Sequence, residues 1–269
     1  MKNFLVRTCS GFIYALLIIG SIAAGPVYFG ILVFVFLMLA LVELYKISFA
    51  EGFRINRVLF IAPAVILYLL IFYWSFNQQF YLTPGLFGLF HLLLVFQLFS
   101  RDKPLIFNRP GFAVLPIVYV AIPLALLNYL YYLPAGMNKE IVVGYFIIIW
   151  LNDTFAYLTG KLFGRHKMFE SVSPNKTWEG SLGGFVFGLA GAYLISLVAT
   201  NMDLFQWLGL AFVTIVLGTF GDLFESLLKR RANLKDSGKI IPGHGGILDR
   251  LDSILISSPF VFLYMYFIG

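Results

Sequence analysis

Residues 27–45, VYFGILVFVFLMLALVELY, decide the fold class, because this run is apolar except for Glu43. A membrane-spanning helix needs about 17–25 predominantly apolar residues. Similar runs recur along the chain, which is 60% hydrophobic and 12% charged and has a mean hydropathy of +0.89. A soluble domain carries about 25% charged residues. The sequence therefore predicts an all-α, polytopic membrane helix bundle.

Polar or turn-forming segments divide the apolar runs, and they set the predicted helix boundaries. No internal repeat or soluble domain interrupts the series, so we predict one integral membrane domain over residues 1–269. Within it, residues 1–139 supply the N-terminal helices and residues 140–269 the catalytic helices and loops. The nine predicted transmembrane helices cover residues 8–24, 27–45, 58–76, 80–99, 111–132, 140–160, 179–200, 204–228 and 251–268.

Basic residues are distributed unevenly between the two sides of the predicted membrane. Of the 19 Lys and Arg residues, all but Lys139 fall at the N-terminus or in loops on its side. Cytoplasmic loops carry an excess of Lys and Arg, so we predict a cytoplasmic N-terminus in a multi-pass protein of the cell (inner, cytoplasmic) membrane. This distribution explains the net charge of +6 without a nucleic-acid partner. As an alternative for the first helix, Lys2, Arg7 and the apolar residues 11–24 could form a cleavable signal peptide.

Four acidic residues lie inside apolar segments, in the predicted cytoplasmic halves of their helices. They are Glu43, Asp153, Asp222 and Glu225. Charges at such positions are energetically expensive and mark functional sites by default. We therefore expect the active site on the cytoplasmic side of the bundle.

The end of the 204–228 segment carries polar residues at helical spacing. Asp222, Glu225, Ser226 and Lys229 are three or four residues apart, so they share one face of a helix. A structural ion pair with an interhelical hydrogen bond would explain this face as well as a catalytic role.

The following loop, residues 235–252, KDSGKIIPGHGGILDRLD, combines glycines, cations and carboxylates. Glycines let backbone N–H groups approach an anionic ligand. Carboxylates can hold Mg²⁺ while Lys and Arg offset phosphate charge, as a nucleoside triphosphate requires. Asp249 and Asp252 are three residues apart and can face the same side. His244 alone would more often be structural, but its combination with the neighbouring carboxylate face favours a nucleotide site.

A second polar cluster precedes the 179–200 segment, within residues 152–184. Lys176 lies just before a predicted helix N-terminus, where backbone N–H groups favour an anion. Simple helix-start chemistry is the alternative for Ser173, Thr177 and Glu179.

These two regions carry a resemblance to a known family. Residues 226–252, SLLKRRANLKDSGKIIPGHGGILDRLD, resemble the signature of the bacterial phosphatidate cytidylyltransferases (CDP-diacylglycerol synthases). Residues 152–184 resemble the second motif region of that family, although Asn175 stands where Lys is common. The resemblance implies a Mg²⁺-dependent reaction of CTP with phosphatidate that yields CDP-diacylglycerol and pyrophosphate. It also implies a nine-helix homodimer among membrane lipids, with a polar cavity open to the cytoplasm.

The resemblance also implies roles for individual residues. Asp222 and Asp249 would bind the metal, with Ser226 and Lys229 lining the same centre and K⁺ as a second cation. Asp236 and Asp252 are candidates for the same metal shell. The candidate substrate-binding residues are Lys176, Lys229, Arg230, Lys235, His244, Gly245, Gly246 and Arg250.

Two other functions fit parts of the sequence. A related CTP-dependent lipid kinase, or a cytidylyltransferase acting on another lipid, would need much the same site. A secondary transporter would place charges at the membrane midplane between matching halves. The chain lacks paired interruptions in matching halves, and its polar residues cluster on one face, so the transporter is disfavoured.

Overall fold

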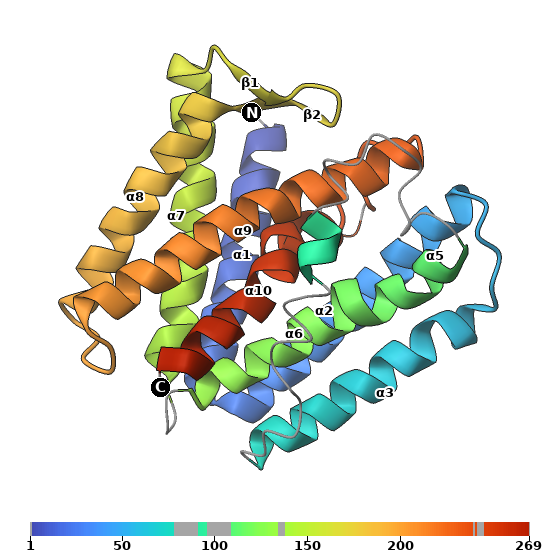
Figure 1. The fold of residues 1–269 in the computed structure, drawn as a ribbon, viewed down its shortest axis with the longest axis horizontal. Helices are drawn as coiled ribbons and strands as arrows, with labels where there is room; N and C mark the ends of the chain where they lie inside the picture. The colour runs from blue at the N-terminus through green and yellow to red at the C-terminus, as the bar shows by residue number, and fades with distance from the viewer. Residues whose placement is uncertain are drawn as a thin grey trace.

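The structure is a computed structural model that describes residues 2–77, 91–95, 109–133, 138–238, 240 and 245–268. Helices dominate it, which confirms the all-α class, and they pack into a bundle (Figure 1). Its elements are α1 (Lys2–Ala24), α2 (Pro26–Ala50), α3 (Arg57–Phe76), α5 (Arg109–Leu115), the π-helix η2 (Pro116–Ala121), α6 (Ile122–Leu126), the 3₁₀-helix η3 (Leu127–Tyr131), α7 (Lys139–Phe163), β1 (Lys167–Phe169), β2 (Ser173–Thr177), α8 (Trp178–Ser196), α9 (Leu204–Arg231) and α10 (Leu248–Ile268).

Six helical segments are long and apolar enough to cross a membrane, so the chain is a multi-pass membrane protein. They are Pro26–Ala50, Arg57–Phe76, Gly111–Tyr131, Lys139–Phe163, Leu204–Arg231 and Leu248–Ile268. The apolar part of α1, Thr8–Ala24, is shorter, and α8 is helical without being among the six. The predicted helix 80–99 lies outside the described residues except for 91–95, which are helical. Nine spans and a cytoplasmic N-terminus therefore stay predictions.

The break between α1 and α2 follows from two adjacent residues. Gly25 has φ 116°, a conformation that favours glycine. Pro26 occupies the first position of α2, where its missing N–H would have no helical partner anyway.

The segment Gly111–Tyr131 is helical but irregular. Pro116 begins the π-helical stretch and Pro123 lies at the start of α6, each removing a backbone donor from the helix. The hydroxyl of Ser258 on α10 donates to the Pro123 carbonyl at 2.9 Å. The irregular segment is thereby fixed against the C-terminal helix.

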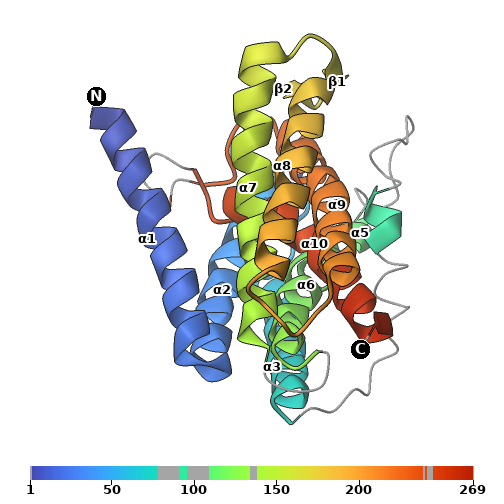
Figure 2. The same cartoon turned by 90° about the vertical axis from the view of Figure 1, so that its left-hand side faces the viewer.

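A two-stranded hairpin forms where the sequence predicted only a polar loop. β1 and β2 are antiparallel, with Lys167 opposite Thr177 and Phe169 opposite Ser173. The hairpin covers the adjoining ends of α7 and α8, and the N-terminus lies at this same end of the bundle (Figures 1 and 2). Thr177 then caps α8 by accepting a hydrogen bond from the Gly180 N–H at 3.2 Å.

Close packing of α7 against α8 depends on glycine. A Cβ at Gly184 would lie 2.7 Å from the main-chain oxygen of Asn152, closer than real Cβ contacts allow. Away from this contact the membrane-length helices expose large apolar side chains, such as Ile66 of α3 and Phe212 of α9, which are 58% and 54% exposed. Exposed apolar side chains on membrane-length helices are expected of a surface that faces lipid.

Candidate active site

A buried ion-pair cluster joins α9 to α10. Lys229 Nζ lies 2.7 Å from Glu225 Oε2, one helical turn earlier, and 2.5 Å from Asp249 Oδ1 at the start of α10. Glu225 is 1% exposed and Lys229 is 9% exposed. An unpaired charge at such a depth would be strongly destabilising, so the three groups hold the two helix ends together.

The loop that precedes α10, which we call the signature loop (residues 235–247), donates hydrogen bonds to the second carboxylate oxygen of Asp249. Asp249 Oδ2 accepts hydrogen bonds from Gly246 N at 2.7 Å and Ser237 N at 3.1 Å, and the Ser237 hydroxyl, which lies between Asp249 and Glu43, is 3.0 Å away. Gly245 has φ 84°, and a Cβ there would lie 2.6 Å from Asp249 Oδ2. Glycine at 245 is therefore required by backbone conformation and by contact with this carboxylate.

Glu43 of α2 binds the same loop. The sequence marked it only as an acidic residue near the site. It is fully buried, and its Oε1 accepts from Ile247 N at 3.1 Å. Its Oε2 accepts from Leu248 N at 3.0 Å and from Ser237 Oγ at 2.9 Å. Glu43 therefore caps the N-terminus of α10 from another helix, where backbone N–H groups favour a carboxylate.

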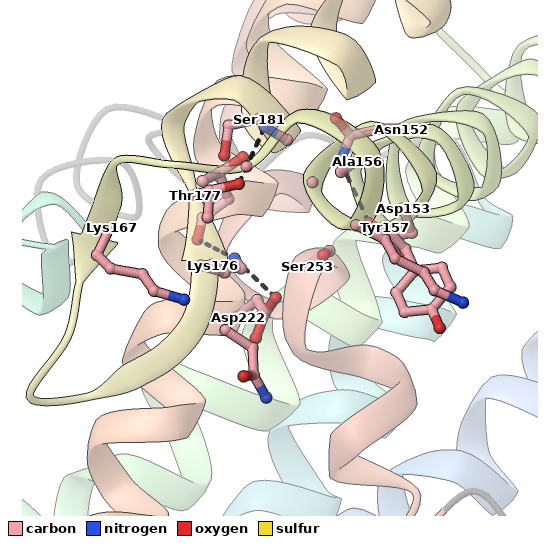
Figure 3. A pocket seen from close by; sticks show the side chains of 16 residues that line it. Asn152, Asp153, Ala156, Tyr157, Lys167, Lys176, Thr177, Ser181, Asp222 and Ser253 are labelled. Atoms are coloured by element: carbon pink, nitrogen blue, oxygen red, sulfur yellow. Dashed lines mark hydrogen bonds and ion pairs between the residues drawn. The ribbon is translucent and has the colours of Figure 1, made fainter.

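A polar cavity of about 550 Å³ lies between α7, β2, α8 and α9. At its wall Lys176 Nζ pairs with Asp222 Oδ2 at 2.7 Å and donates to the Thr219 carbonyl at 3.2 Å. Figure 3 shows Lys176 of β2 meeting Asp222 of α9, with Lys167 of β1 on the same side. The β-hairpin thus brings two cations to a cavity within the size range of small-molecule sites.

The opposite wall of the cavity comes from α7. Asn152 and Asp153 line it, and Asn152 Nδ2 donates to Asp153 Oδ1 at 3.2 Å (Figure 3). Asp153 interacts electrostatically with Asp222, and both interact with Asp252 of α10. Lys176 is the cation common to Asp153 and Asp252. Lys176 therefore pairs directly with Asp222 and interacts electrostatically with two further carboxylates, those of Asp153 and Asp252.

The predicted metal-binding residues are divided between these two places. Asp222 lines the polar cavity, whereas Asp249 belongs to the Lys229 cluster. Asp252 accepts from the Ser253 N–H at 2.7 Å, and Asp236 is exposed on the loop. Within the described part of the chain, no three His, Cys, Asp or Glu residues form a group that could hold a metal ion. The predicted metal shell stays a prediction.

The remaining predicted site residues occupy varied positions. Ser226 is buried beside the Lys229 cluster, and Lys235 is exposed. Arg230 donates to the carbonyls of Val172 at 3.4 Å and Leu234 at 3.2 Å, so it joins the hairpin region to the loop. Arg250 lines a smaller cavity beside α1. His244 lies outside the described residues.

Sequence reasoning missed several lining residues of the polar cavity. Lys161 and Lys167 are near the cavity because α7 ends there and the hairpin folds back over it. The second polar cluster of the sequence already contained Asp153, Tyr157 and Gly160, which share one face of α7, whereas Lys161 and Lys167 stood out only as basic loop residues.

Comparison with known proteins gives one consistent result. The profile of the Cytidylyltransferase family matches residues 5–268. The phosphatidate cytidylyltransferase of Staphylococcus haemolyticus is 33% identical over 261 residues, covering 94% of this chain and 96% of that protein. The protein of the same name from Staphylococcus epidermidis is 32% identical over 258 residues, with coverage of 94% and 96%. The chain therefore belongs to the cytidylyltransferase family and is a nucleotidyltransferase related to the bacterial phosphatidate cytidylyltransferases.

Proposed function

We propose that the protein is a phosphatidate cytidylyltransferase, which converts CTP and phosphatidate to CDP-diacylglycerol and pyrophosphate. The observation that carries this proposal is the polar cavity bordered by Lys176 and Asp222 inside a bundle of membrane-length helices. A polar site built into such a bundle lets a water-soluble nucleotide meet the headgroup of a membrane lipid. The names of the relatives support the same activity.

In the proposed reaction a phosphate oxygen of phosphatidate attacks the α-phosphorus of CTP. The bond from the α-phosphorus to the oxygen bridging to the β-phosphorus breaks, and its electron pair leaves with pyrophosphate. A phosphomonoester is largely ionised at pH 7, so the attack needs little proton transfer. The protein's task is then to position the substrates and to offset charge.

The cations around the polar cavity suit the triphosphate. Lys161, Lys167 and Lys176 all line it. Lysine binds phosphate as a point charge on a flexible side chain. Several lysines can therefore stabilise the negative charge that builds up on the leaving pyrophosphate. Thr177 and Ser181 add hydroxyl groups to the same wall. We propose that the nucleotide binds here, with Arg230, Lys235, His244 and the 245–246 glycines as further contacts from the loop.

The acidic groups of this region are the basis for proposing a divalent cation. Five cations, Lys161, Lys167, Lys176, Lys229 and Arg250, accompany six acidic groups: Glu43, Asp153, Asp222, Glu225, Asp249 and Asp252. Glu225 Oε1 is buried and accepts no hydrogen bond from the described residues. Carboxylate oxygens are ligands that a hard cation such as Mg²⁺ prefers.

We propose that Asp222 and Asp249 hold Mg²⁺, with Asp236 and Asp252 as further candidates and K⁺ as a second cation. When bound, Mg²⁺ would offset phosphate charge and stabilise the leaving pyrophosphate. Lys176 and Lys229, which already pair with Asp222 and Asp249, would keep these carboxylates oriented. Ser226 would line the same centre.

We further propose that the protein is a homodimer of the cell (inner, cytoplasmic) membrane with its cavity facing the cytoplasm. The basic residues of the hairpin and of the α9–α10 loop support this orientation by the positive-inside rule.

The proposal is tested with purified protein, CTP, Mg²⁺ and a panel of lipid acceptors in detergent micelles. Phosphatidate should give CDP-diacylglycerol, while diacylglycerol and polyprenol should give no product. Product from one of the other acceptors and none from phosphatidate would show a related enzyme that acts on another lipid.

A further inference from the structure

A second cavity, of about 250 Å³, lies beside α1. Its walls come from α1, α7 and α10, and they include Ser10, Tyr14, Trp150, Asp153 and Arg250. It is too small for a whole lipid, since pockets that enclose ligands measure about 300–1,000 Å³. Its volume suits a compact polar headgroup.

The two cavities meet at Asp153. This residue belongs to the walls of both, and among the described lining residues no other does. A group in the small cavity and a group in the large one therefore approach each other across a single side chain. Transfer of a cytidylyl group from one substrate to the other needs two neighbouring sites of this kind, so that the attacking phosphate oxygen can reach the α-phosphorus beside Asp153.

The small cavity borders the lipid-facing side of the bundle. Phe12 and Leu16 of α1 are 67% and 60% exposed, whereas Tyr14 and Ala15 of the same helix line the cavity. Figure 2 shows the N-terminal part of α1 standing away from α7 and the rest of the bundle. The Tyr14 hydroxyl reaches the Arg250 carbonyl at 3.4 Å, which connects α1 to the start of α10.

Arg250 gives the small cavity its cation. Its side chain is exposed, and it forms no ion pair with any residue in the described ranges. Guanidinium binds phosphate in a bidentate manner and remains charged at every physiological pH. An unpaired arginine in a small cavity next to lipid is suited to the phosphomonoester of a membrane lipid.

We propose that the cavity between α1, α7 and α10 binds the phosphate headgroup of phosphatidate, with Arg250 as its anion-binding residue. The acyl chains would leave between α1 and α7 into the membrane, and CTP would occupy the larger cavity across Asp153. This assignment rests on the proposed function. It makes α1 part of the lipid-binding site and not only a membrane anchor.

Filling the small cavity from α1 tests this inference. Ala15→Trp places a large side chain in the cavity wall, and Leu16→Trp, on the exposed side of the same helix, is the matched control. Steady-state kinetics in mixed micelles should show at least a tenfold higher KM for phosphatidate in Ala15→Trp, with the KM for CTP within twofold of wild type. Leu16→Trp should resemble wild type in both constants.

Other outcomes would overturn the inference. Equal kinetics for the two variants would show that the cavity is not used, and an increase confined to the KM for CTP would place the nucleotide there. Wild-type protein that makes no CDP-diacylglycerol would instead contradict the proposed function.

A binding measurement covers the case in which Ala15→Trp fails to fold. Wild-type protein should retain phosphatidate over diacylglycerol on purification from micelles that contain both lipids. Arg250→Ala should lose that preference, and Arg250→Lys should keep part of it. Unchanged preference in Arg250→Ala would refute the assignment.

Discussion

Glu43 connects α2 to the signature loop, and the loss of stability on its substitution can be worked out from its hydrogen bonds. In Glu43→Gln the side chain keeps its size, but one carboxylate oxygen becomes an NH₂ group. That group would face a backbone donor, either Ile247 N on one side or Leu248 N on the other. A hydrogen bond to a charged group contributes about 1.5–3 kcal/mol, and a buried donor left unsatisfied costs about 1–3 kcal/mol.

We therefore expect Glu43→Gln to destabilise the protein by about 3 kcal/mol. For a chain of this size that corresponds to a decrease of about 6–12 °C in Tm, at roughly 2–4 °C per kcal/mol. The assay is thermal unfolding of the detergent-purified variant, followed by intrinsic fluorescence. The kcat should also fall, because Ser237 donates its hydroxyl to Glu43 and its backbone N–H to Asp249, and its position would shift.

Ser48→Ala is the matched control in the same helix. Ser48 is also buried, but its hydroxyl donates only to the Leu44 carbonyl one turn earlier, at 2.9 Å. Its loss should cost less than about 1 kcal/mol. A Tm for Glu43→Gln within about 2 °C of this control would refute the capping role of Glu43.

The other predictions concern the metal, the cavity and the orientation. Excess EDTA should abolish product formation and added Mg²⁺ should restore it, as measured by pyrophosphate release; equal activity in EDTA would exclude the metal-centred scheme. Asp222→Asn should abolish turnover yet remain monodisperse, because the ion pair that it breaks with Lys176 is partly exposed and such pairs contribute little to stability; near-normal kcat would show a structural carboxylate. Lys235→Ala should mainly raise the KM for CTP, since it removes one exposed contact among several; a large fall in kcat would contradict this. Cysteine at Lys167 should react with an impermeant maleimide only from the cytoplasm, and cysteine at Lys139 only from outside; the reverse labelling would invert the orientation.

Hydropathy predicted most helices because lipid imposes a simple rule. A chain in hydrocarbon must satisfy its backbone hydrogen bonds internally, so apolar runs of membrane length become helices. The predicted runs 27–45 and 58–76 correspond to α2 and α3 with boundaries within a few residues at most ends. The irregular turns at Pro116 and Pro123 could not be predicted, because they depend on contacts such as that of Ser258 with Pro123.

The sequence predicted which residues form the candidate site, but not which of their side chains contact each other. Helical spacing correctly placed Glu225 next to Lys229, since that contact lies within one helix. The spacing also grouped Asp222 with them, whereas the structure pairs Asp222 with Lys176 from the hairpin. Such a contact depends on the tertiary arrangement of distant segments, which spacing within one helix does not contain.

The hydrogen bonds of Glu43 were even less predictable from the sequence, because they join segments that are far apart in the chain. Its partners Ser237, Ile247 and Leu248 are about two hundred residues away in the chain. The sequence marked Glu43 as an expensive charge in an apolar run but contained no local signal for its partners. The hairpin was missed because β1 and β2 are short and polar, without the alternation of a half-buried strand.

The fate of the phosphorus atoms of CTP distinguishes cytidylyl transfer from phosphoryl transfer. Wild-type protein would be incubated with phosphatidate, Mg²⁺ and CTP that carries ³²P at either the α or the γ position. The account predicts that α-label appears in CDP-diacylglycerol and γ-label in pyrophosphate, in equal amounts. Label from the γ position in the lipid would show a CTP-dependent kinase, and the absence of α-label from the lipid would contradict the proposed attack on the α-phosphorus.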